Sequence, residues 1–466
     1  MTSPSTGSGP RHFDLAVIGS GSGNTIVDDS FADWEVAILE KGTFGGTCLN
    51  VGCIPTKMFV YPADQAYAAS HADRLGVETS FERARWPEIR DRIFGRIDPI
   101  ASSGRDWRAT GRPNVTLFEG HARFTDVRTL DTGTGETITA DHVVIATGSR
   151  PQHPYVPGLD DVPFHTSDTV MRIDDLPQRL LILGGGFVSA EFAHVFSSFG
   201  TRVTVVNRSG LLLREEDHDI ASRFTELAQR RWDVRLDTQV TKLERAGDGV
   251  RAHLDDGTTV EADLLLVATG RRSNSDLLDV DRTGVEVGER GLVLVDPHQR
   301  TNVDGVWALG DVSNAFQLKH VSNAEARTIR HNLLHPDDLV STDHEHVPSA
   351  VFSHPQVASV GLTEQQARAA GRSYVVGRRD YAGTAYGWAM EDEGSFVKVL
   401  ADPDTGLLIG GHLVGPQAST LIQPLIQAMS LGQTAHDVAR GQYWIHPALT
   451  EVVENALLAL PPARAG

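Results

Sequence analysis

The chain has 466 residues, a formal net charge of −19, 40% hydrophobic residues and 22% charged residues. This length exceeds one ordinary hydrophobic core, so two or three domains are expected. The acidic balance argues against nucleic acid as a partner, and no apolar run approaches the roughly 18 residues of a membrane span. Residues 1–11 are rich in Ser, Gly and Pro without an apolar stretch, which predicts a disordered tail; with only two cysteines in the chain, this favours a cytoplasmic protein.

The first element is an apolar run at 14–18, typical of a buried parallel strand, followed by the turn 19–24 (GSGSGN). Gly19, Gly21 and Gly23 would let the backbone approach a pyrophosphate, although Asn24 replaces the third glycine of the usual pattern. A helix is expected after this turn, with its positive N-terminus toward the phosphates.

A second strand at 36–39 ends in Glu40, where a carboxylate can bind the hydroxyls of an adenosine ribose. A glycine turn alone is often only a turn. The strand, the expected helix and Glu40 together favour a dinucleotide site.

Both cysteines, Cys48 and Cys53, lie in one glycine-flanked run at 45–57 (GGTCLNVGCIPTK). Five residues of undistorted helix span about 7.5 Å, whereas bridged Cα atoms are rarely more than about 6.8 Å apart. A disulfide therefore requires a bend, which Gly52 and Pro55 permit, and its strain would make it easy to reduce. The spacing predicts a disulfide used in chemistry. Two buried free thiols are the alternative, and half a zinc site is disfavoured because no second ligand pair lies nearby.

A second glycine turn follows the apolar strand 180–183. It contains Gly184 and Gly186, and Ser189 takes the third small position. This repeat of the strand-and-turn pattern predicts a second dinucleotide site of related design.

The strand of this second site at 203–206 ends without an acid, because Asn207 and then Arg208 follow it, and Arg214 lies six residues further on. A carboxylate there would repel a 2′-phosphate, whereas guanidinium groups bind one. The site is therefore expected to prefer NADPH over NADH. Alternatively, either arginine is simply solvated.

Each dinucleotide unit closes on a similar strand and turn, the first at Thr147 and Gly148 and the second at Gly270. A third such segment ends in Asp311, which suits a polyhydroxyl chain such as ribityl. These repeats predict an α/β fold with two Rossmann-like nucleotide-binding domains and a C-terminal α+β domain. The expected boundaries are a tail at 1–11, a split first domain at 12–150 and 275–344, a second domain at 151–274, and a C-terminal domain at 345–466.

The C-terminal part shows strands at 351–352 and 396–400 and apolar-faced helices at 419–431 and 449–460. Between them, Pro447 disfavours helix at His446, so its imidazole can project from a loop. Glu451 is expected one turn into the next helix, where its carboxylate can orient that imidazole. Without other evidence, the pattern around His446 favours an ordinary surface histidine.

Three motifs follow one another along the chain: the cysteine run, the segment 308–311 (ALGD), and the pair His446 and Glu451. In this order they resemble the flavoprotein disulfide reductases, the group of glutathione reductase and dihydrolipoamide dehydrogenase. The resemblance extends from residue 14 to residue 460. It implies FAD at the first site and NADPH at the second, and a homodimer in which the matching histidine comes from the other subunit. On the FAD side it implies Gly19, Gly21, Gly23, Glu40, Thr47, Lys57, Thr147, Gly148 and Asp311, and on the NADPH side Gly184, Gly186, Ser189, Glu191, Asn207, Arg208, Arg214 and Gly270. Lys57 and Glu191 match a pair beside the flavin.

The resemblance also implies the order of electron transfer, from NADPH through the flavin to the Cys48–Cys53 disulfide. Cys53 would be the thiolate nearer the flavin, and Cys48 the thiol that attacks the substrate disulfide. His446, oriented by Glu451, would take the proton of Cys48 and return it to the departing thiol.

Residues that the sequence lacks exclude some classes of substrate. The sequence has no third cysteine, which the relays of mercuric reductases and large thioredoxin reductases need. The NAD-dependent dihydrolipoamide dehydrogenases usually carry an acid at the position where this chain has Asn207. A small-molecule disulfide is therefore expected. The segments 19–24, 53–61, 94–100, 386–392 and 442–451 resemble the members that reduce mycothione in actinobacteria. The alternatives are a reductase of another small disulfide such as glutathione disulfide and, in a different class, a flavin-binding scaffold or sensor without turnover.

Overall fold

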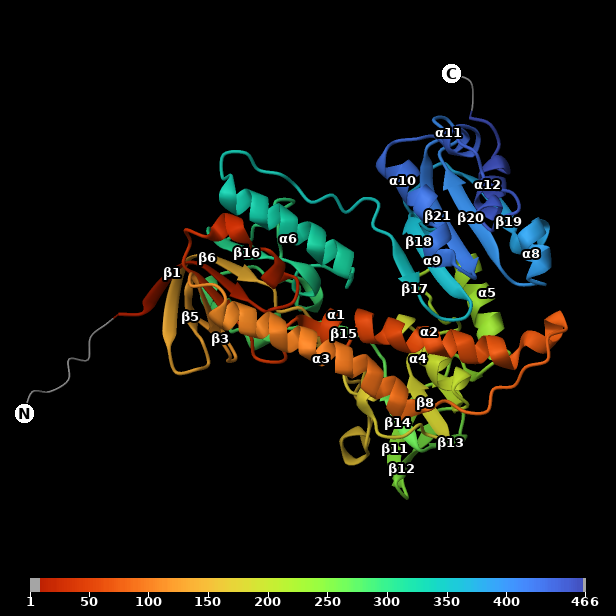
Figure 1. The fold of residues 1–466 in the computed structure, drawn as a ribbon, viewed down its shortest axis with the longest axis horizontal. Helices are drawn as coiled ribbons and strands as arrows, with labels where there is room; N and C mark the ends of the chain where they lie inside the picture. The colour runs from red at the N-terminus through yellow and green to blue at the C-terminus, as the bar shows by residue number, and fades with distance from the viewer. Residues whose placement is uncertain (1–8, 464–466) are drawn as a thin grey trace, which may run out of the picture. The chain divides into compact units, whose positions relative to one another are not determined.

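The computed structural model describes residues 9–463, which divide into two compact units (Figure 1). Among the described residues, the first unit is built from 9–56, 90–152 and 271–344, and the second from 57–89, 153–270 and 345–463. Of the tail expected at 1–11, residues 1–8 lie outside the described part of the chain, and Arg11 already belongs to the first strand.

A largely parallel sheet forms the centre of the first unit. Its strands run in the order β3-β2-β1-β6-β5-β4, and β16 also pairs with β6, so a segment that follows the second glycine turn returns to this sheet. The elements are β1 (Arg11–Ile18), β2 (Val36–Leu39), β3 (Val115–Phe118), β4 (Arg123–Asp126), β5 (Thr129–Asp131), β6 (Thr137–Ile145), β7 (Ser149–Pro151), β15 (Arg271–Ser273), β16 (Val306–Ala308), α1 (Gly46–Asn50) and α6 (Lys319–Leu334). Two further helices, α2 (Cys53–Ser70) and α3 (Trp86–Thr110), contribute residues to both units.

The central strands of this sheet are buried on both faces. All four residues of β2 (VAIL) are buried, as expected for a parallel strand covered on both sides. One hydrophobic cluster contains Ala16 and Ile18 of β1, and a second contains its Leu15 and Val17. Because successive side chains of a strand point to opposite faces, the two clusters cover the two faces of the sheet.

The helix expected after the first glycine turn is a wrong prediction. In its place lie two 3₁₀ turns of three residues each, Gly23–Thr25 and Asp29–Phe31. Between them, the side chain of Asp28 accepts a hydrogen bond from the backbone N–H of Ser30 (3.0 Å). Such local side-chain bonds compete with helix propagation.

The carbonyl groups of this segment are satisfied by a side chain of α3 instead of by helical bonds. Nη2 of the buried Arg108 donates to the carbonyl oxygens of Asn24 and Val27, at 2.8 Å each. This tertiary contact, absent from any local pattern, explains why a short non-helical segment is stable here.

The second unit contains a four-stranded parallel sheet of order β10-β9-β8-β14 and a three-stranded antiparallel sheet of order β11-β12-β13. This is the second nucleotide-binding fold expected from the sequence. Its elements are β8 (Arg179–Leu183), β9 (Arg202–Val206), β10 (Asp233–Arg235), β11 (Val240–Ala246), β12 (Gly249–Leu254), β13 (Thr259–Ala262), β14 (Leu264–Val267), α4 (Phe187–Ser198) and α5 (His218–Gln229).

The same unit ends in a five-stranded antiparallel sheet of order β17-β18-β21-β20-β19, against which α9, α10 and α12 pack (Figure 1). The predicted α/β fold class, with a C-terminal α+β part, is thereby confirmed. The elements are β17 (Ser349–Val351), β18 (Gln356–Gly361), β19 (Val375–Asp380), β20 (Phe396–Ala401), β21 (Leu408–Gly415), α7 (Glu364–Ala369), α8 (Ala385–Ala389), α9 (Ala418–Leu421), α10 (Gln423–Ser430), α11 (Ala435–Arg440) and α12 (Glu451–Leu458).

Two helix predictions in this part need correction. The single helix expected at 419–431 is divided into α9 and α10, because Pro424 occupies the first turn of α10, a position that proline tolerates at the start of a helix and not within one. The helix expected from 449 begins only at Glu451, so Glu451 opens α12 and does not lie one turn into it.

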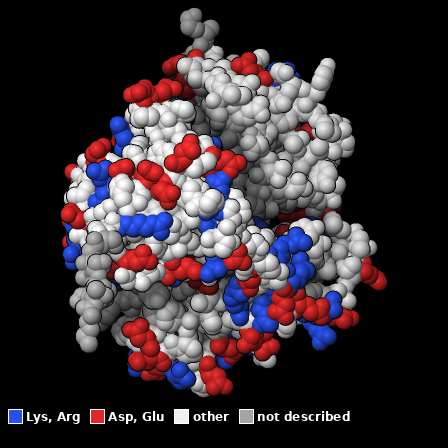
Figure 2. Space-filling model, turned by 60° about the vertical axis from the view of Figure 1, so that its left-hand side comes forward, with Lys and Arg blue, Asp and Glu red and all other residues white. Residues whose placement is uncertain are grey.

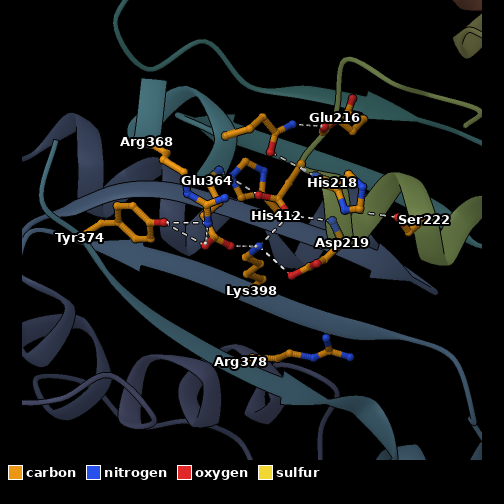
Figure 3. Close-up of polar contacts among 12 residues, drawn as sticks. Glu216, His218, Asp219, Ser222, Glu364, Arg368, Tyr374, Arg378, Lys398 and His412 are labelled. Atoms are coloured by element: carbon orange, nitrogen blue, oxygen red, sulfur yellow. Dashed lines mark hydrogen bonds and ion pairs between the residues drawn. The ribbon is translucent and has the colours of Figure 1, made fainter. Parts of the chain in front are cut away.

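A buried lysine joins the nucleotide-binding and C-terminal parts of the second unit (Figure 3). Nζ of Lys398 on β20 lies 2.8 Å from carboxylate oxygens of both Asp217 and Asp219, at the start of α5, and 2.6 Å from Glu364 on α7. Burial alone would lower the pKa of Lys398, but the three carboxylate bonds outweigh it and raise that pKa above its ordinary value. The buried charge is thus compensated, as a stable interior ion cluster requires.

The surface carries both signs of charge. On the face shown in Figure 2, acidic and basic side chains are interspersed and form no single basic surface. Among residues 9–463, no helix is long and apolar enough to cross a membrane.

Candidate active site

The two cysteines stand on either side of a bend. Cys48 lies within α1, and α2 begins at Cys53. The chain turns at Val51, whose φ of −143° is not helical, and at Gly52, where an added Cβ would lie 3.0 Å from the carbonyl oxygen of Thr47. The bend that the five-residue spacing demands is therefore present, and Gly52 allows it.

Asn50 anchors this bend, a role that no motif in the sequence predicted. Its side chain is buried, and Nδ2 donates to the carbonyl oxygens of Thr43, Phe44 and Gly46 at 3.3, 3.0 and 3.1 Å. These bonds tie α1 to the turn before it. The only signal in the sequence was a polar side chain between two apolar ones, since its acceptors are defined by the folded backbone.

The two cysteines are not joined by a disulfide in the structure, and Cys48 is partly buried and Cys53 exposed. The pKa of the Cys48 thiol is lowered to about 7, mainly because Cys53 is hydrogen-bonded to it and also because Lys319 contributes positive charge, while burial opposes both effects. A thiol with this pKa is about half thiolate at neutral pH, and the thiolate is the form that attacks a disulfide. The pair is thus suited to thiol–disulfide exchange.

The first glycine turn and Glu40 form one cradle. Glu40 accepts hydrogen bonds from the backbone N–H and the hydroxyl of Ser20, at 2.9 and 2.6 Å. Gly19 has a φ of +108°, and a Cβ there would lie 2.4 Å from the carbonyl oxygen of Ala146. Only glycine fits that position, so the backbone of the turn stays open beside the carboxylate.

Asp311 lies on a turn that two side chains hold. Ser149 donates its hydroxyl to Asp311 Oδ2 at 2.7 Å, and the buried Glu325 of α6 accepts the backbone N–H of Gly310 at 2.6 Å. Neither Ser149 nor Glu325 was identified from the sequence, because both are remote from Asp311 along the chain. They orient the carboxylate expected to bind a ribityl chain.

Thr147 and Gly148 follow β6 as expected. Asn274 binds both backbone carbonyl groups, that of Thr147 through its side chain at 2.8 Å and that of Gly148 through its backbone N–H at 3.0 Å. Oγ1 of Thr147 is buried and has no hydrogen-bond partner among residues 9–463. Thr47, in α1, is exposed, and its carbonyl accepts the N–H of Val51 at 2.9 Å.

In the second glycine turn, Gly184 has a φ of +113°, and a Cβ there would lie 2.3 Å from the carbonyl oxygen of Ala268. Gly186 has open space where a Cβ would stand. Ser189 is buried near the start of α4, and its hydroxyl has no hydrogen-bond partner in the described part of the chain. The turn therefore offers open backbone and an unused hydroxyl donor.

Asn207 differs from the two arginines that follow β9. Its side chain is buried and turned inward, with Nδ2 donating to the carbonyl oxygens of Ser209 and Leu211 at 2.9 Å each. Arg208 and Arg214 are exposed. Asn207 thus shapes the turn, and the arginine side chains face solvent. Gly270, with a φ of +122° and open space at its Cβ position, ends the second fold.

Lys57 and Glu191 form an ion pair, with 2.7 Å between Lys57 Nζ and Glu191 Oε1. The backbone N–H of Phe352 donates to the same oxygen at 2.9 Å, and the lysine ammonium lies 3.7 Å from the centre of the Phe352 ring. Phe352, absent from the sequence-based set, therefore fixes both members of the pair.

His446 and Glu451 also form a pair, with 2.8 Å between His446 Nδ1 and Glu451 Oε1. The imidazole is 71% exposed, whereas the glutamate side chain is only 17% exposed. A carboxylate at Nδ1 favours the tautomer with its proton there, which leaves Nε2 free to accept and return a proton. The pair is arranged as a general acid–base group.

The chemistry of both glycine turns fits dinucleotides. Each follows a buried parallel strand, and the unpartnered hydroxyls of Thr147 and Ser189 together with the carboxylates of Glu40 and Asp311 match phosphate, ribose and ribityl groups.

Comparison with known proteins agrees with this geometry. Residues 13–327 match the family model for pyridine nucleotide-disulphide oxidoreductases, and residues 347–457 match the dimerisation domain of the same family. The chain is 54% identical over 457 residues to mycothione reductase of Mycobacterium tuberculosis, covering 96% of this chain and 99% of that protein. It is 35% identical to a mercuric reductase of Streptomyces lividans, with 94% of each chain covered, and 34% identical to a dihydrolipoyl dehydrogenase of Haloferax volcanii, with 95% and 96% covered.

Among solved structures, the HOCl-induced flavoprotein disulfide reductase RclA from Escherichia coli superposes with a TM-score of 0.84 at 29% identity, covering 96% of this chain and 99% of that one. The two nucleotide folds, the cysteine pair and the whole-length matches lead to one conclusion. This chain belongs to the pyridine nucleotide-disulphide oxidoreductase family, as an enzyme that uses FAD and NADPH.

Proposed function

We propose that this enzyme reduces mycothione, the disulfide of mycothiol, with NADPH as the electron donor. The observation that carries the proposal is the 54% identity to mycothione reductase over nearly the whole of both chains, against 35% and 34% for the mercuric reductase and the dihydrolipoyl dehydrogenase. The sequence contains only Cys48 and Cys53, which favours a small disulfide that needs no relay cysteine.

When bound, FAD and NADPH supply the two electrons that convert the Cys48–Cys53 disulfide into two thiols. The Cys48 thiolate then attacks one sulfur of mycothione, whose S–S bond breaks as a mixed disulfide forms and the first thiol leaves. Cys53 attacks Sγ of Cys48, which re-forms the Cys48–Cys53 disulfide and releases the second thiol. The two electrons of the dithiol thus pass to the two sulfurs of the substrate. The lowered pKa of Cys48 supports its role as the attacking thiol.

His446 moves the proton in this scheme. Nε2 accepts the proton of Cys48 and returns it to the first departing thiol, because a protonated sulfur leaves more readily than a thiolate. Glu451 binds Nδ1 and holds the imidazole in its orientation. We propose that His446 serves the cysteine pair of the other subunit, a proposal supported by its 71% exposure in the single chain and by the dimerisation-domain match that surrounds it.

We also propose the domain boundaries of the chain and its assembly. The FAD domain comprises 12–150 and 275–344, the NADPH domain 151–274 and the interface domain 345–466, with the working enzyme a cytoplasmic homodimer. The return of β16 to the first sheet supports a split FAD domain, and the dimerisation-domain match over residues 347–457 supports the last boundary.

The substrate proposal is tested by the rate of NADPH oxidation with purified mycothione and with glutathione disulfide, at equal concentrations. Faster turnover of mycothione, by about 100-fold or more in kcat/KM, is expected if the site recognises the sugar-bearing thiol. Faster turnover of glutathione disulfide would overturn the assignment. No turnover of either, with FAD bound, would favour a scaffold or sensor.

Arg208→Ala is expected to raise the KM for NADPH by about tenfold or more, the effect of losing one charge-assisted contact to the 2′-phosphate, while the KM for NADH changes little. Steady-state kinetics with both nucleotides measure the difference. Arg245→Ala removes another exposed arginine from β11 of the same fold and serves as the control. Equal changes with NADPH and NADH would show that Arg208 does not read the phosphate.

A further inference from the structure

Lys319 places a positive charge at the first glycine turn. It is the first residue of α6 and is half-buried, and its Nζ donates to the hydroxyl of Ser22 at 2.8 Å. Ser22 lies in the middle of the turn that follows β1. The charge of Lys319 also acts on Cys48, so its ammonium lies where it affects both the glycine turn and the cysteine run.

This ammonium has no carboxylate partner in the described part of the chain. Three of the other lysines do: Lys57 pairs with Glu191, Lys242 with Glu244, and Lys398 with three carboxylates. Among residues 9–463, Lys319 instead donates to a neutral hydroxyl, that of Ser22. A half-buried cation without a counter-ion is unfavourable, which points to an anion supplied from outside the chain.

The glycine turn also lacks the usual source of positive potential. In dinucleotide-binding folds, the diphosphate lies at the N-terminus of the helix after the glycine turn, where free N–H groups and the helix dipole favour negative charge. Here two separate 3₁₀ turns of three residues each follow, Gly23–Thr25 and Asp29–Phe31. Such a short turn aligns too few peptide groups to supply a comparable dipole.

We propose that Lys319 is a cofactor-binding residue of the FAD site, where its ammonium compensates the charge of the FAD diphosphate in place of the missing helix N-terminus. This proposal accounts for two features together. The glycine turn lacks the helix N-terminus that usually binds the diphosphate, and Lys319 lacks a carboxylate partner in the described part of the chain. The inference rests on the assignment of FAD to the first glycine turn and is independent of the identity of the disulfide substrate.

The test is the retention of FAD by the Lys319→Gln holoenzyme, in the absence of any disulfide. Serial dilution of the purified holoenzyme, followed by the fluorescence of released FAD, measures the Kd. An increase of about tenfold or more is expected, as for the loss of one charge-assisted contact. Lys319→Arg keeps the charge and should hold the Kd within about threefold of the wild type. Lys242→Gln removes an exposed lysine of β11 and should leave the Kd unchanged.

Two results would overturn the proposal. The first is an unchanged Kd in Lys319→Gln together with a raised pKa of Cys48, measured by the pH dependence of its alkylation in the reduced enzyme; Lys319 would then serve the thiol and not the cofactor. The second uses the wild-type holoenzyme and needs no variant to fold. Release of FAD should increase with ionic strength, since salt screens the contact between lysine and diphosphate, and FAD retention independent of salt would contradict that contact.

Discussion

Cys48→Ser is expected to lower disulfide reduction by about 10⁴-fold or more, because the nucleophile that attacks the substrate is lost and the remaining residues cannot replace it. Cys53→Ser should lower turnover equally, because the mixed disulfide can no longer be resolved. The two variants are distinguished by the long-wavelength absorption band of a thiolate beside the flavin in the NADPH-reduced enzyme. The band should persist in Cys48→Ser and disappear in Cys53→Ser, and the reverse pattern would exchange the two roles.

In the wild-type enzyme, the pKa of Cys48 can be measured from the pH dependence of its alkylation. The pKa of Cys48 is lowered to about 7, so its thiolate is present above that pH and becomes protonated as the pH falls through it. The rate of alkylation of the reduced enzyme should therefore rise with pH, with a midpoint near 7, and level off above it. A midpoint near 9, the ordinary value, would show that neither Cys53 nor Lys319 assists the thiol.

His446→Gln is the second change with a large expected effect. Loss of a general acid–base group typically lowers a rate by about 10²–10⁴-fold, so disulfide turnover should fall within that range. Electron transfer from NADPH to an artificial acceptor such as ferricyanide should be unaffected, because it does not require a proton for a departing thiol. Glu451→Gln should have a smaller effect, since it removes the partner of Nδ1 and keeps the imidazole. His436→Gln, at an exposed histidine of α11, is the matched control.

Mixed dimers test which subunit supplies the histidine. A dimer of one Cys48→Ser chain and one His446→Gln chain, each strongly impaired alone, has one complete site if His446 acts across the interface, because the intact cysteine and the intact histidine then meet. Recovery of activity after the subunits are exchanged is the expected result. If His446 acts within its own chain, no mixed dimer is active, and the cross-interface proposal is wrong.

Local patterns predicted the parts of this protein that depend on short stretches of chain. Hydrophobic period, spacing and residue type were enough to predict three features. These are the strand and glycine turn at 14–24, the repeat at 180–189, and the bend between the two cysteines. The buried parallel strands and the bend at Gly52 are found as expected. The helix predicted after the first glycine turn was wrong, since hydrogen bonds from Arg108 of α3 satisfy the carbonyl groups of that segment.

The sequence by itself determined the α/β class, the presence of two dinucleotide turns and a reactive cysteine pair, because each is encoded within a few neighbouring residues. Only the tertiary structure showed that Glu325 and Ser149 hold the turn of Asp311, that Phe352 fixes Lys57 and Glu191, and that Lys319 reaches Ser22. These partners are up to roughly 300 residues apart, and no periodicity or propensity relates them. Contacts between distant segments arise only when sheets and helices pack, and they place the charges on which the chemistry depends.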